Sequence, residues 1–129
     1  MGFLNKYKTD KTAELAGVWV DVDAGVEWKI ARLSNEKART ERRNLEKPYR
    51  NFQNIPDSVA EDILRKVVAR TVLLDWKGMT DTDGKEIPHS PAKAEELFKE
   101  FPDLLSDVVG LAMARETFQA EAAEAAKND

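Results

Sequence analysis

The sequence predicts an α+β fold in which an N-terminal β-hairpin packs on a mainly α-helical body of about four helices. The stretch GVWVDVDAGVEWKIARL, residues 17–33, contains two runs of alternating apolar and polar side chains around a turn, which is typical of a hairpin. Further along, apolar residues recur at helical spacing in separate segments, which indicates amphipathic helices. The length of 129 residues suits a single domain with one hydrophobic core.

Composition divides the chain into three parts. Residues 1–16 show no clear apolar period, and we expect a flexible N-terminal arm that is mobile or loosely docked. Residues 17–119 carry the hairpin and the helical periodicity, and they should form the single α+β domain. Residues 120–129, AEAAEAAKND, keep helix propensity without an apolar face, so this tail is expected to be a frayed helix.

The hairpin is expected to consist of strands at Gly17–Val22 and Val26–Leu33, with Gly25 of the connecting loop Asp23-Ala24-Gly25 in the left-handed conformation. Side chains alternate across a strand, so one face should be apolar and the other polar. The pairs expected on the core face are Val22 with Val26, Val20 with Trp28, and Val18 with Ile30. The pairs expected on the outer face are Trp19 with Lys29 and Asp21 with Glu27. Trp19 is therefore a large aromatic residue on a polar face.

Two helices are expected to follow the hairpin. Ser34 or Asn35 can cap a nearly all-polar helix that ends before Pro48, because proline disfavours helix in the preceding residue. The next segment, residues 57–76, has the strongest helical periodicity, and Asp57 or Ser58 can cap it. Its expected core face, which should lie across the hairpin, consists of Ala60, Ile63, Leu64, Val67, Val68, Thr71 and Leu74.

Two shorter helices should complete the body. Ser90-Pro91 is a helix start, and the amphipathic segment that follows is stopped by Pro102. Its expected apolar face is Ala94, Leu97, Phe98 and Phe101. The final helix is expected to begin at Pro102 and to contribute Leu104, Leu105, Val108, Val109, Leu111, Ala112 and Phe118 to the core.

Charge is distributed unevenly along the chain. Residues 1–50 carry 11 Lys or Arg against 8 Asp or Glu, whereas residues 51–129 carry 9 against 16. This asymmetry suits orientation against another protein or a second copy, and the plain alternative is a solvated surface that keeps the chain soluble. The basic residues of the first half gather around the polar helix at Lys37, Arg39, Arg42, Arg43, Lys47 and Arg50. Because Glu36, Glu41 and Glu46 interleave with them, no nucleic-acid partner is expected.

Several kinds of chemistry have no residues to support them. The absence of cysteine excludes disulfides and thiolate metal sites. No apolar run suits a signal peptide or approaches the roughly 20 residues of a membrane span, so we expect a soluble protein without a membrane partner. The one histidine, His89, stands between Pro88 and Ser90, where a loop or capping role is the simpler interpretation. Without a nucleophile motif or a phosphate-binding loop, neither a cofactor nor an enzymatic activity is expected.

The loop WKGMTDTDGKEIPHSP, residues 76–91, resembles the start of a calcium-binding loop. A calcium loop with Gly84 at its sixth position would begin at Met79 and end at Ser90. Met79 cannot replace the carboxylate of the first position, and Ser90 cannot replace the glutamate of the last one. The metal interpretation therefore fails. Asp83-Gly84 predicts a hairpin-type turn instead.

The order of these segments resembles the tail assembly chaperones of long-tailed, siphovirus-type bacteriophages. In that family a Gly-x-Trp-x strand and a Lys-Ile-Ala-Arg-Leu-type strand open the chain, as residues 17–33 do here. The later matches are Trp76-Lys77-Gly78, Asp81 to Gly84, Ile87 to Pro91, and the helix from Leu104 onward. The resemblance covers about residues 15–119 and rests on the order of the motifs.

The resemblance implies a non-enzymatic protein of the host cell cytoplasm that is absent from the mature virion. Its members bind the long, helical tape-measure protein, keep it soluble, and help to recruit tail-tube subunits around it. Many also have a short and a frameshift-extended form, and this chain would correspond to the short one. A chaperone for an amphipathic client needs an apolar strip or groove and a charged surface. The candidate partner-binding residues are Trp19, Lys29, Leu111 and Phe118.

Two other functions remain as alternatives, a structural tail or connector subunit of the virion and a small DNA-binding regulator. Trp19 also has two interpretations. In the first, Trp19 has a structural role: the N-terminal arm or the polar helix covers it, or it stacks on Lys29. In the second, Trp19 anchors the client or another copy of the chain.

Overall fold

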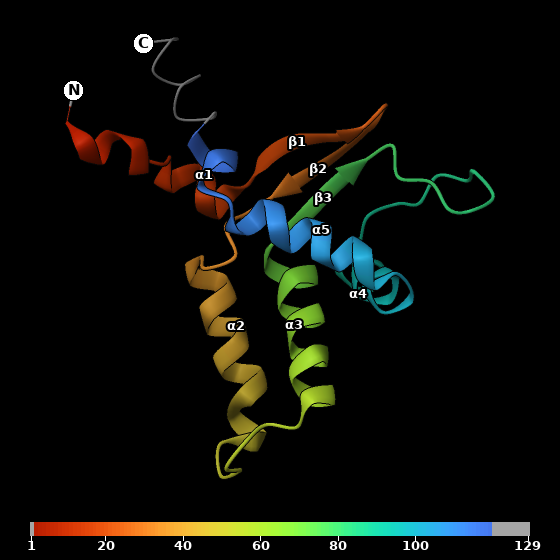
Figure 1. The fold of residues 1–129 in the computed structure, drawn as a ribbon. Coiled ribbons are helices and arrows are strands. Elements are labelled where there is room, and N and C mark those ends of the chain that lie inside the picture. The colour runs from red at the N-terminus through yellow and green to blue at the C-terminus, as the bar shows by residue number, and fades with distance from the viewer. Residues whose placement is uncertain (1, 120–129) are drawn as a thin grey trace.

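The computed structural model describes residues 2–119 and has an α+β fold, as predicted (Figure 1). A three-stranded antiparallel sheet has the order β1-β2-β3, and the two helices α2 and α3 extend side by side away from one end of it. The helices are α1 (Lys11–Ala16), α2 (Glu36–Glu46), α3 (Asp57–Thr71), α4 (Pro91–Glu100) and α5 (Pro102–Met113), with short 3-10 helices η1 (Phe3–Tyr7) and η2 (Lys47–Tyr49). The strands are β1 (Val18–Asp23), β2 (Val26–Ile30) and β3 (Leu73–Lys77). The predicted tail, residues 120–129, lies outside the described residues.

The predicted hairpin is confirmed, with a change near its turn and a shorter second strand, since β2 ends at Ile30 rather than at Leu33. Val20 pairs with Trp28 and Trp19 pairs with Lys29, as the alternation required. The expected Val22–Val26 pair is wrong, because Asp23 pairs with Val26 and an irregularity lies between Asp21 and Asp23. The extra residue shortens the loop, so that β1 continues to Asp23. Val22 nevertheless packs against the hydrophobic core.

The third strand was missed by the sequence prediction. The helix expected over residues 57–76 ends at Thr71, and β3 begins at Leu73 and pairs with β2, placing Trp28 opposite Trp76. An apolar run such as Val72 to Leu74 suits a buried strand as well as a helix, so its periodicity could not decide. The backbone hydrogen-bonding groups at the edge of β2 need partners, and β3 provides them. The pairing of the two segments continues beyond the strands, where the Ala31 amide donates to the Val72 carbonyl at 2.9 Å.

The helix starts follow the predicted caps in two of three places. Asn35 caps α2, and its side-chain oxygen accepts a hydrogen bond from the Ala38 amide at 2.9 Å. Ser90 caps α4 by accepting from the Lys93 amide at 3.0 Å. Helix α3 begins at Asp57 as expected but has Pro56 at the N-cap position and no side-chain cap. Proline fixes the backbone before the first turn, so the start is defined without a capping side chain.

The loop between β3 and α4 forms the predicted turn. Thr80 and Glu86 form an isolated antiparallel bridge, and Gly84 has a φ of 83°. The loop begins at Gly78, whose φ is 74° and which lies against the hairpin turn at Gly25, whose φ is 78°. A β-carbon added at Gly78 would lie 1.9 Å from the Gly25 carbonyl oxygen, so only glycine permits this approach.

The segment predicted to be an N-terminal arm contains two short helices, η1 and α1. Asp10 caps α1 through the Ala13 amide, and Ala13 is buried in the core. The Asp10 amide donates to the Phe118 carbonyl, and the Arg32 amide donates to the Glu14 carbonyl at 2.7 Å. These contacts dock α1 on the body, whereas η1 contains no buried residue. The sequence left the choice between a mobile and a loosely docked arm open, because α1 presents one small apolar side chain to the core.

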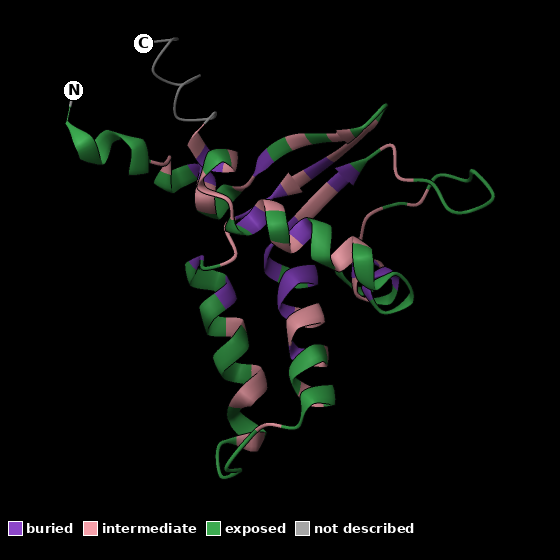
Figure 2. Ribbon diagram, viewed as in Figure 1, coloured by how far each residue is buried: buried purple, intermediate pink, exposed green. Residues whose placement is uncertain are grey.

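The core lies between the inner face of the sheet and helices α3, α4 and α5. Figure 2 shows buried residues along the sheet and the sheet-proximal half of α3, while the far end of the α2–α3 pair is exposed. Helix α5 ends at Met113, and residues 115–119 are again helical after a break at Ala114. The largest fully buried side chains are Phe98, Phe118, Ile30, Leu73, Val67, Val68, Val72 and Val108. The four helices of the predicted body are thus α2 to α5.

Candidate functional site

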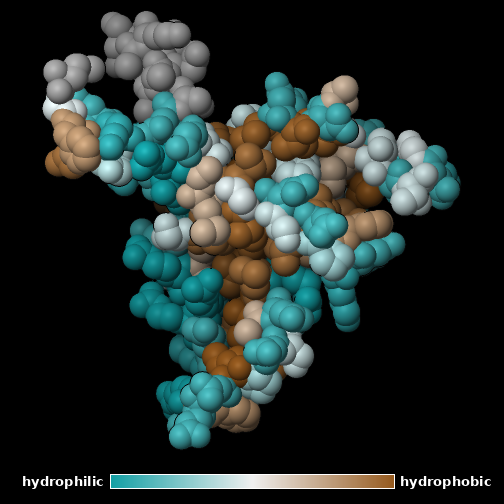
Figure 3. Space-filling view, in the orientation of Figure 1, coloured by the Kyte–Doolittle hydropathy of each residue, from teal (hydrophilic) through white to brown (hydrophobic). Residues whose placement is uncertain are grey.

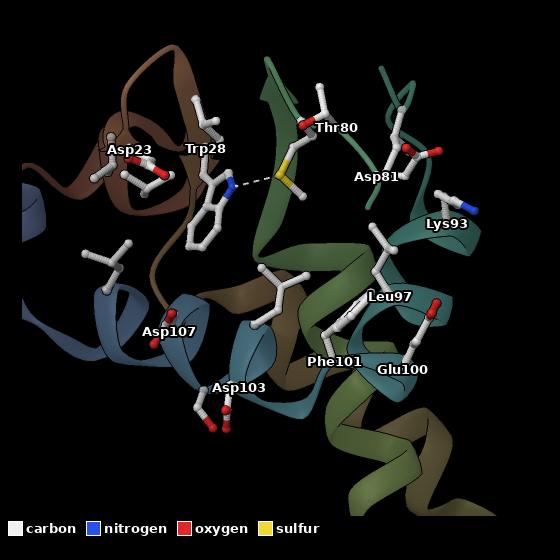
Figure 4. A pocket seen from close by; sticks show the side chains of 18 of the residues that line it. Asp23, Trp28, Thr80, Asp81, Lys93, Leu97, Glu100, Phe101, Asp103 and Asp107 are labelled. Atoms are coloured by element: carbon white, nitrogen blue, oxygen red, sulfur yellow. Dashed lines mark hydrogen bonds between the residues drawn. The ribbon is translucent and has the colours of Figure 1, made fainter. Parts of the chain in front are cut away.

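An open groove of about 1070 Å³ lies between the turn end of the β1–β2 hairpin, the loop after β3, and helices α4 and α5. Its position follows from the fold, because the turn end of the β1–β2 hairpin extends beyond the part of the sheet that the helices cover. Figure 4 shows Trp28 of β2 in the groove, with Leu97 of α4, Phe101 between α4 and α5, and the loop residues Thr80 and Asp81 around it. The volume lies at the upper end of the roughly 300–1,000 Å³ that is typical of ligand pockets.

The floor of the groove is apolar. Its apolar lining residues are Val20, Val22, Val26, Trp28, Met79, Ile87, Leu97, Phe101, Leu104 and Leu111. The Trp28 indole N–H points at the Met79 sulfur at 3.4 Å, which fixes both side chains at the wall. Phe101 retains 41% of its exposure although it follows the apolar face of α4. Among the apolar lining side chains, Phe101 is therefore the most exposed.

The rim of the groove is acidic. Five carboxylates, Asp23, Asp81, Glu100, Asp103 and Asp107, stand around the floor, against one basic residue, Lys93. None of these five forms an ion pair with a residue that the structure describes, and Lys93 is paired with Glu96 at 3.4 Å. In Figure 4 the acids come from separate elements, Asp23 from the hairpin, Glu100 from α4, and Asp103 and Asp107 from α5. The rim therefore attracts positively charged groups toward an apolar floor.

This combination suits a segment that is itself amphipathic. Apolar side chains of a helix or short peptide can occupy the floor, while Lys or Arg side chains at its edges reach the rim carboxylates. The floor supplies the burial energy, and the rim supplies orientation and a faster encounter. The arrangement is that of a docking groove for a basic amphipathic partner.

Trp19 and Lys29 lie on the outer face of the sheet and do not line the groove. Trp19 is 38% exposed, and the ammonium of Lys77 lies 4.1 Å from the centre of its ring. The expected stacking partner, Lys29, pairs with Trp19 across the strands and also faces Asp75 of β3. The unpredicted strand β3 thus provides the cation.

Leu111 and Phe118 have different surroundings. Leu111 is half-buried and lines the groove, so it is the one candidate partner residue that the structure places there. Phe118 is fully buried, and the Arg32 guanidinium lies 5.4 Å from the centre of its ring. The Phe118 side chain packs in the core, where it lies between α1 and the rest of the domain. Phe118 is therefore not available to a partner in this structure.

The acidic rim was not identified from the sequence. The excess of negative charge in residues 51–129 was the signal, but it did not say which acids share a surface. Asp23 comes from the half of the chain that is basic overall, and only the hairpin packing brings it to the groove that Asp103 and Asp107 also line. The bulge at the hairpin turn, which no pattern in the sequence predicts, sets the place of Asp23.

His89 has a packing role in the structure. Its ring lies edge-on to Trp76 with the ring centres 4.6 Å apart, and its Nε2 lies 3.2 Å from the Leu73 carbonyl oxygen. Within residues 2–119, no group of three or more metal-ligating side chains gathers in one place. The helices of the same residues are all too short or too polar to cross a membrane.

Comparison with known proteins gives a family match. The profile of a family described as YdaY prophage protein matches residues 29–128, which include the last two residues of β2 and all later described elements, the groove-lining helices among them. No significant match is found among curated proteins or among solved structures.

Proposed function

We propose that this chain, which belongs to the YdaY prophage protein family and is therefore phage-derived, is a tail assembly chaperone that binds the tape-measure protein. The observation that carries the proposal is the apolar groove with its acidic rim. In this proposal, basic amphipathic helical segments of the tape-measure protein dock in the groove. Their apolar faces are covered there, and the client stays soluble until the tail tube forms around it.

The groove has the properties that this task requires. A long helical client exposes apolar stripes, which aggregate unless another surface covers them. An open groove accepts many related segments, because its floor selects apolar side chains at helical spacing rather than one fixed shape. The uncompensated rim carboxylates keep the empty chaperone soluble and reject acidic segments.

The remaining parts of the proposal follow from the resemblance of residues 15–119 to tail assembly chaperones. The chain acts without enzymatic activity in the host cell cytoplasm, helps to recruit tail-tube subunits to the bound tape-measure protein, and leaves before the virion is complete. The prophage origin of the family supports a role in phage morphogenesis, and the groove supports a client-binding one.

The test is coexpression with the tape-measure protein of the same prophage. The groove variant Glu100→Lys/Asp107→Lys reverses two exposed rim charges on adjacent helices. The matched control Glu46→Lys/Glu61→Lys makes the same change in net charge on α2 and α3, outside the groove. We expect wild type and control to keep the client soluble and to copurify with it. The groove variant should bind at least about tenfold more weakly, a loss of about 1.4 kcal/mol.

Two results would contradict the proposal. Equal client binding by the groove variant and the control would exclude the groove as the site. A client whose solubility does not depend on this chain would exclude the chaperone function itself. Mass spectrometry of purified particles adds a further check, because a stoichiometric presence in the virion would favour a structural tail or connector subunit.

A further inference from the structure

The N-terminal segment, residues 3–8, exposes apolar side chains and contains no buried residue. Phe3 is 70% exposed, Leu4 72% and Tyr7 47%. The same segment carries Lys6, whose ammonium lies 4.1 Å from the centre of the Phe3 ring, and Lys8. In Figure 3 this end forms an apolar projection apart from the rest of the surface. A folded domain gains nothing from exposing such side chains, so their presentation calls for a partner.

The groove is complementary to this segment in both polarity and charge. Its floor offers apolar side chains, and its rim offers five carboxylates against one lysine that is already paired. Phe3 and Leu4 can enter the floor while Lys6 and Lys8 reach the rim. Aromatic side chains dominate the binding energy of most interfaces, and rim charges fix their orientation.

The segment and the groove of one molecule cannot meet. In Figure 1 the N-terminus lies at one end of the molecule, and the hairpin turn, the β3–α4 loop and α4 lie at the other. The segment is also tied to its own end, because the Asp10 amide donates to the Phe118 carbonyl and the Gln119 side chain donates to the Lys6 carbonyl. Docking must therefore take place between two molecules.

We propose that residues 3–8 of one copy occupy the acidic groove of a second copy, so that the protein associates head to tail when no client is bound. The contact is heterologous, with a different surface on each partner, and it generates a ring or an open chain of subunits. The inference concerns the regulation of the groove assigned under the proposed function. A basic amphipathic client segment binds by displacing the N-terminal segment of the neighbouring copy, so client binding disassembles the array.

The experiment is a complementation test with full-length proteins in sedimentation velocity. The segment variant is Phe3→Ala/Leu4→Ala, which leaves the groove intact and removes no buried side chain. The groove variant is Glu100→Lys/Asp107→Lys, which leaves the segment intact. Wild type should self-associate with rising concentration, and more weakly with rising salt. Each variant alone should associate at least about tenfold more weakly. Their mixture should form one-to-one dimers and nothing larger, because only one productive contact remains.

Two controls match these variants. Phe52→Ala removes another exposed phenylalanine, which lies beyond the far end of α2, and Glu46→Lys/Glu61→Lys repeats the charge change outside the groove. Both should associate as wild type does. Circular dichroism and urea unfolding should show that every variant folds.

Three results would overturn the inference: a wild type that is monomeric at every concentration, association that survives the segment variant, or variants that do not complement each other. The proposed function fails separately. If the wild type is monomeric and still binds the tape-measure protein through the groove, the chaperone function stands and the head-to-tail contact is wrong. If complementation succeeds but no client binds, the head-to-tail contact stands and the chaperone function is wrong.

Discussion

The ammonium nitrogen of Lys77 lies 4.1 Å from the centre of the Trp19 ring. Lys77, the last residue of β3, therefore reaches across β2 to a side chain on the outer face of β1. Lys29 lies between them in the sheet, opposite Trp19. The large aromatic on the outer face is therefore partly covered by a residue from a strand that the sequence did not predict. Its remaining exposure of 38% keeps the interpretation as a partner anchor open to experiment.

Replacing Trp19 with alanine should destabilise the protein only moderately. The substitution removes one cation–π contact and part of a half-exposed ring, and we expect a loss of about 1–2 kcal/mol in the free energy of unfolding. Trp28→Ala is the matched control, because an emptied core tryptophan site costs about 3–5 kcal/mol. Urea unfolding measures both. Equal losses would mean that the outer face of the sheet is covered by something the structure does not describe.

Replacing Asn35 with aspartate should be nearly as damaging as replacing it with alanine. The Asn35 side chain caps α2 through its oxygen, and its amide donates to the carbonyls of Arg32 at 2.7 Å and Thr71 at 3.1 Å. Aspartate keeps the cap but loses both donors and places a negative charge beside two carbonyl oxygens. We expect each variant to lose about 2–3 kcal/mol in urea unfolding at neutral pH. If Asn35→Asp is as stable as wild type, the cap alone matters and the buried amide contacts are not formed.

Gly78→Ala should be far more damaging than Gly84→Ala. Both glycines have positive φ, and an alanine there costs about 1 kcal/mol through its backbone conformation. Position 84 has open space around it, whereas a β-carbon at position 78 would lie 1.9 Å from the Gly25 carbonyl oxygen. We expect Gly78→Ala to lose at least about 2 kcal/mol more than Gly84→Ala in thermal or urea unfolding. Similar losses would show that the loop after β3 can move away from the hairpin turn at little cost.

Asp62→Asn should reduce stability at neutral pH and have no effect in acid. The Lys66 ammonium, which donates a 2.7 Å hydrogen bond to Asp62, holds the pKa of that carboxyl below its usual range. Because the folded-state pKa is lowered, the contribution is present above the unfolded pKa of about 3.9 and is lost as the pH falls through the folded pKa. For this partly exposed pair we expect about 0.3–0.5 kcal/mol at pH 7, vanishing near pH 2.

The control for this variant is Glu61→Gln, which removes the neighbouring exposed carboxylate. Glu61 forms no ion pair with any residue that the structure describes, and Arg65, four residues away, pairs with Asp62 at 3.7 Å. Urea unfolding at both pH values should leave Glu61→Gln close to wild type. A pH-independent loss in Asp62→Asn would assign its effect to packing rather than to the ion pair.

The parts of the fold that depend on local rules could be predicted from the sequence. Alternation placed Trp28 inside and Trp19 outside, and the caps at Asn35 and Ser90 followed from the residues that favour helix starts. Strand β3 could not be predicted, because apolar residues occur on both sides of Thr71 and do not mark the end of α3. The edge of β2, with which β3 pairs, lies far away in sequence.

The candidate site depends on non-local packing, and this is why the sequence located only one of its residues in advance. Leu111 was identified from the apolar face of the last helix, and it lines the groove. The rim carboxylates looked like ordinary solvated charges, because nothing local distinguishes Asp107 from Asp57. Only the meeting of the hairpin turn with α4 and α5 makes some of them neighbours of an apolar floor.

The late position of β3 in the chain sets an order of events during synthesis. The β1–β2 hairpin leaves the ribosome first, but its pairing with β3, such as Trp28 with Trp76, has to wait until the whole α2–α3 pair has emerged. Until then one edge and the apolar face of the hairpin meet solvent, and helix α5 covers part of that face last. We therefore expect amide protons of β2 that bond to β3 to gain protection later in refolding than those that bond to β1, which pulsed hydrogen exchange can resolve. The finished groove is the portion of that early exposed face that the later helices never cover.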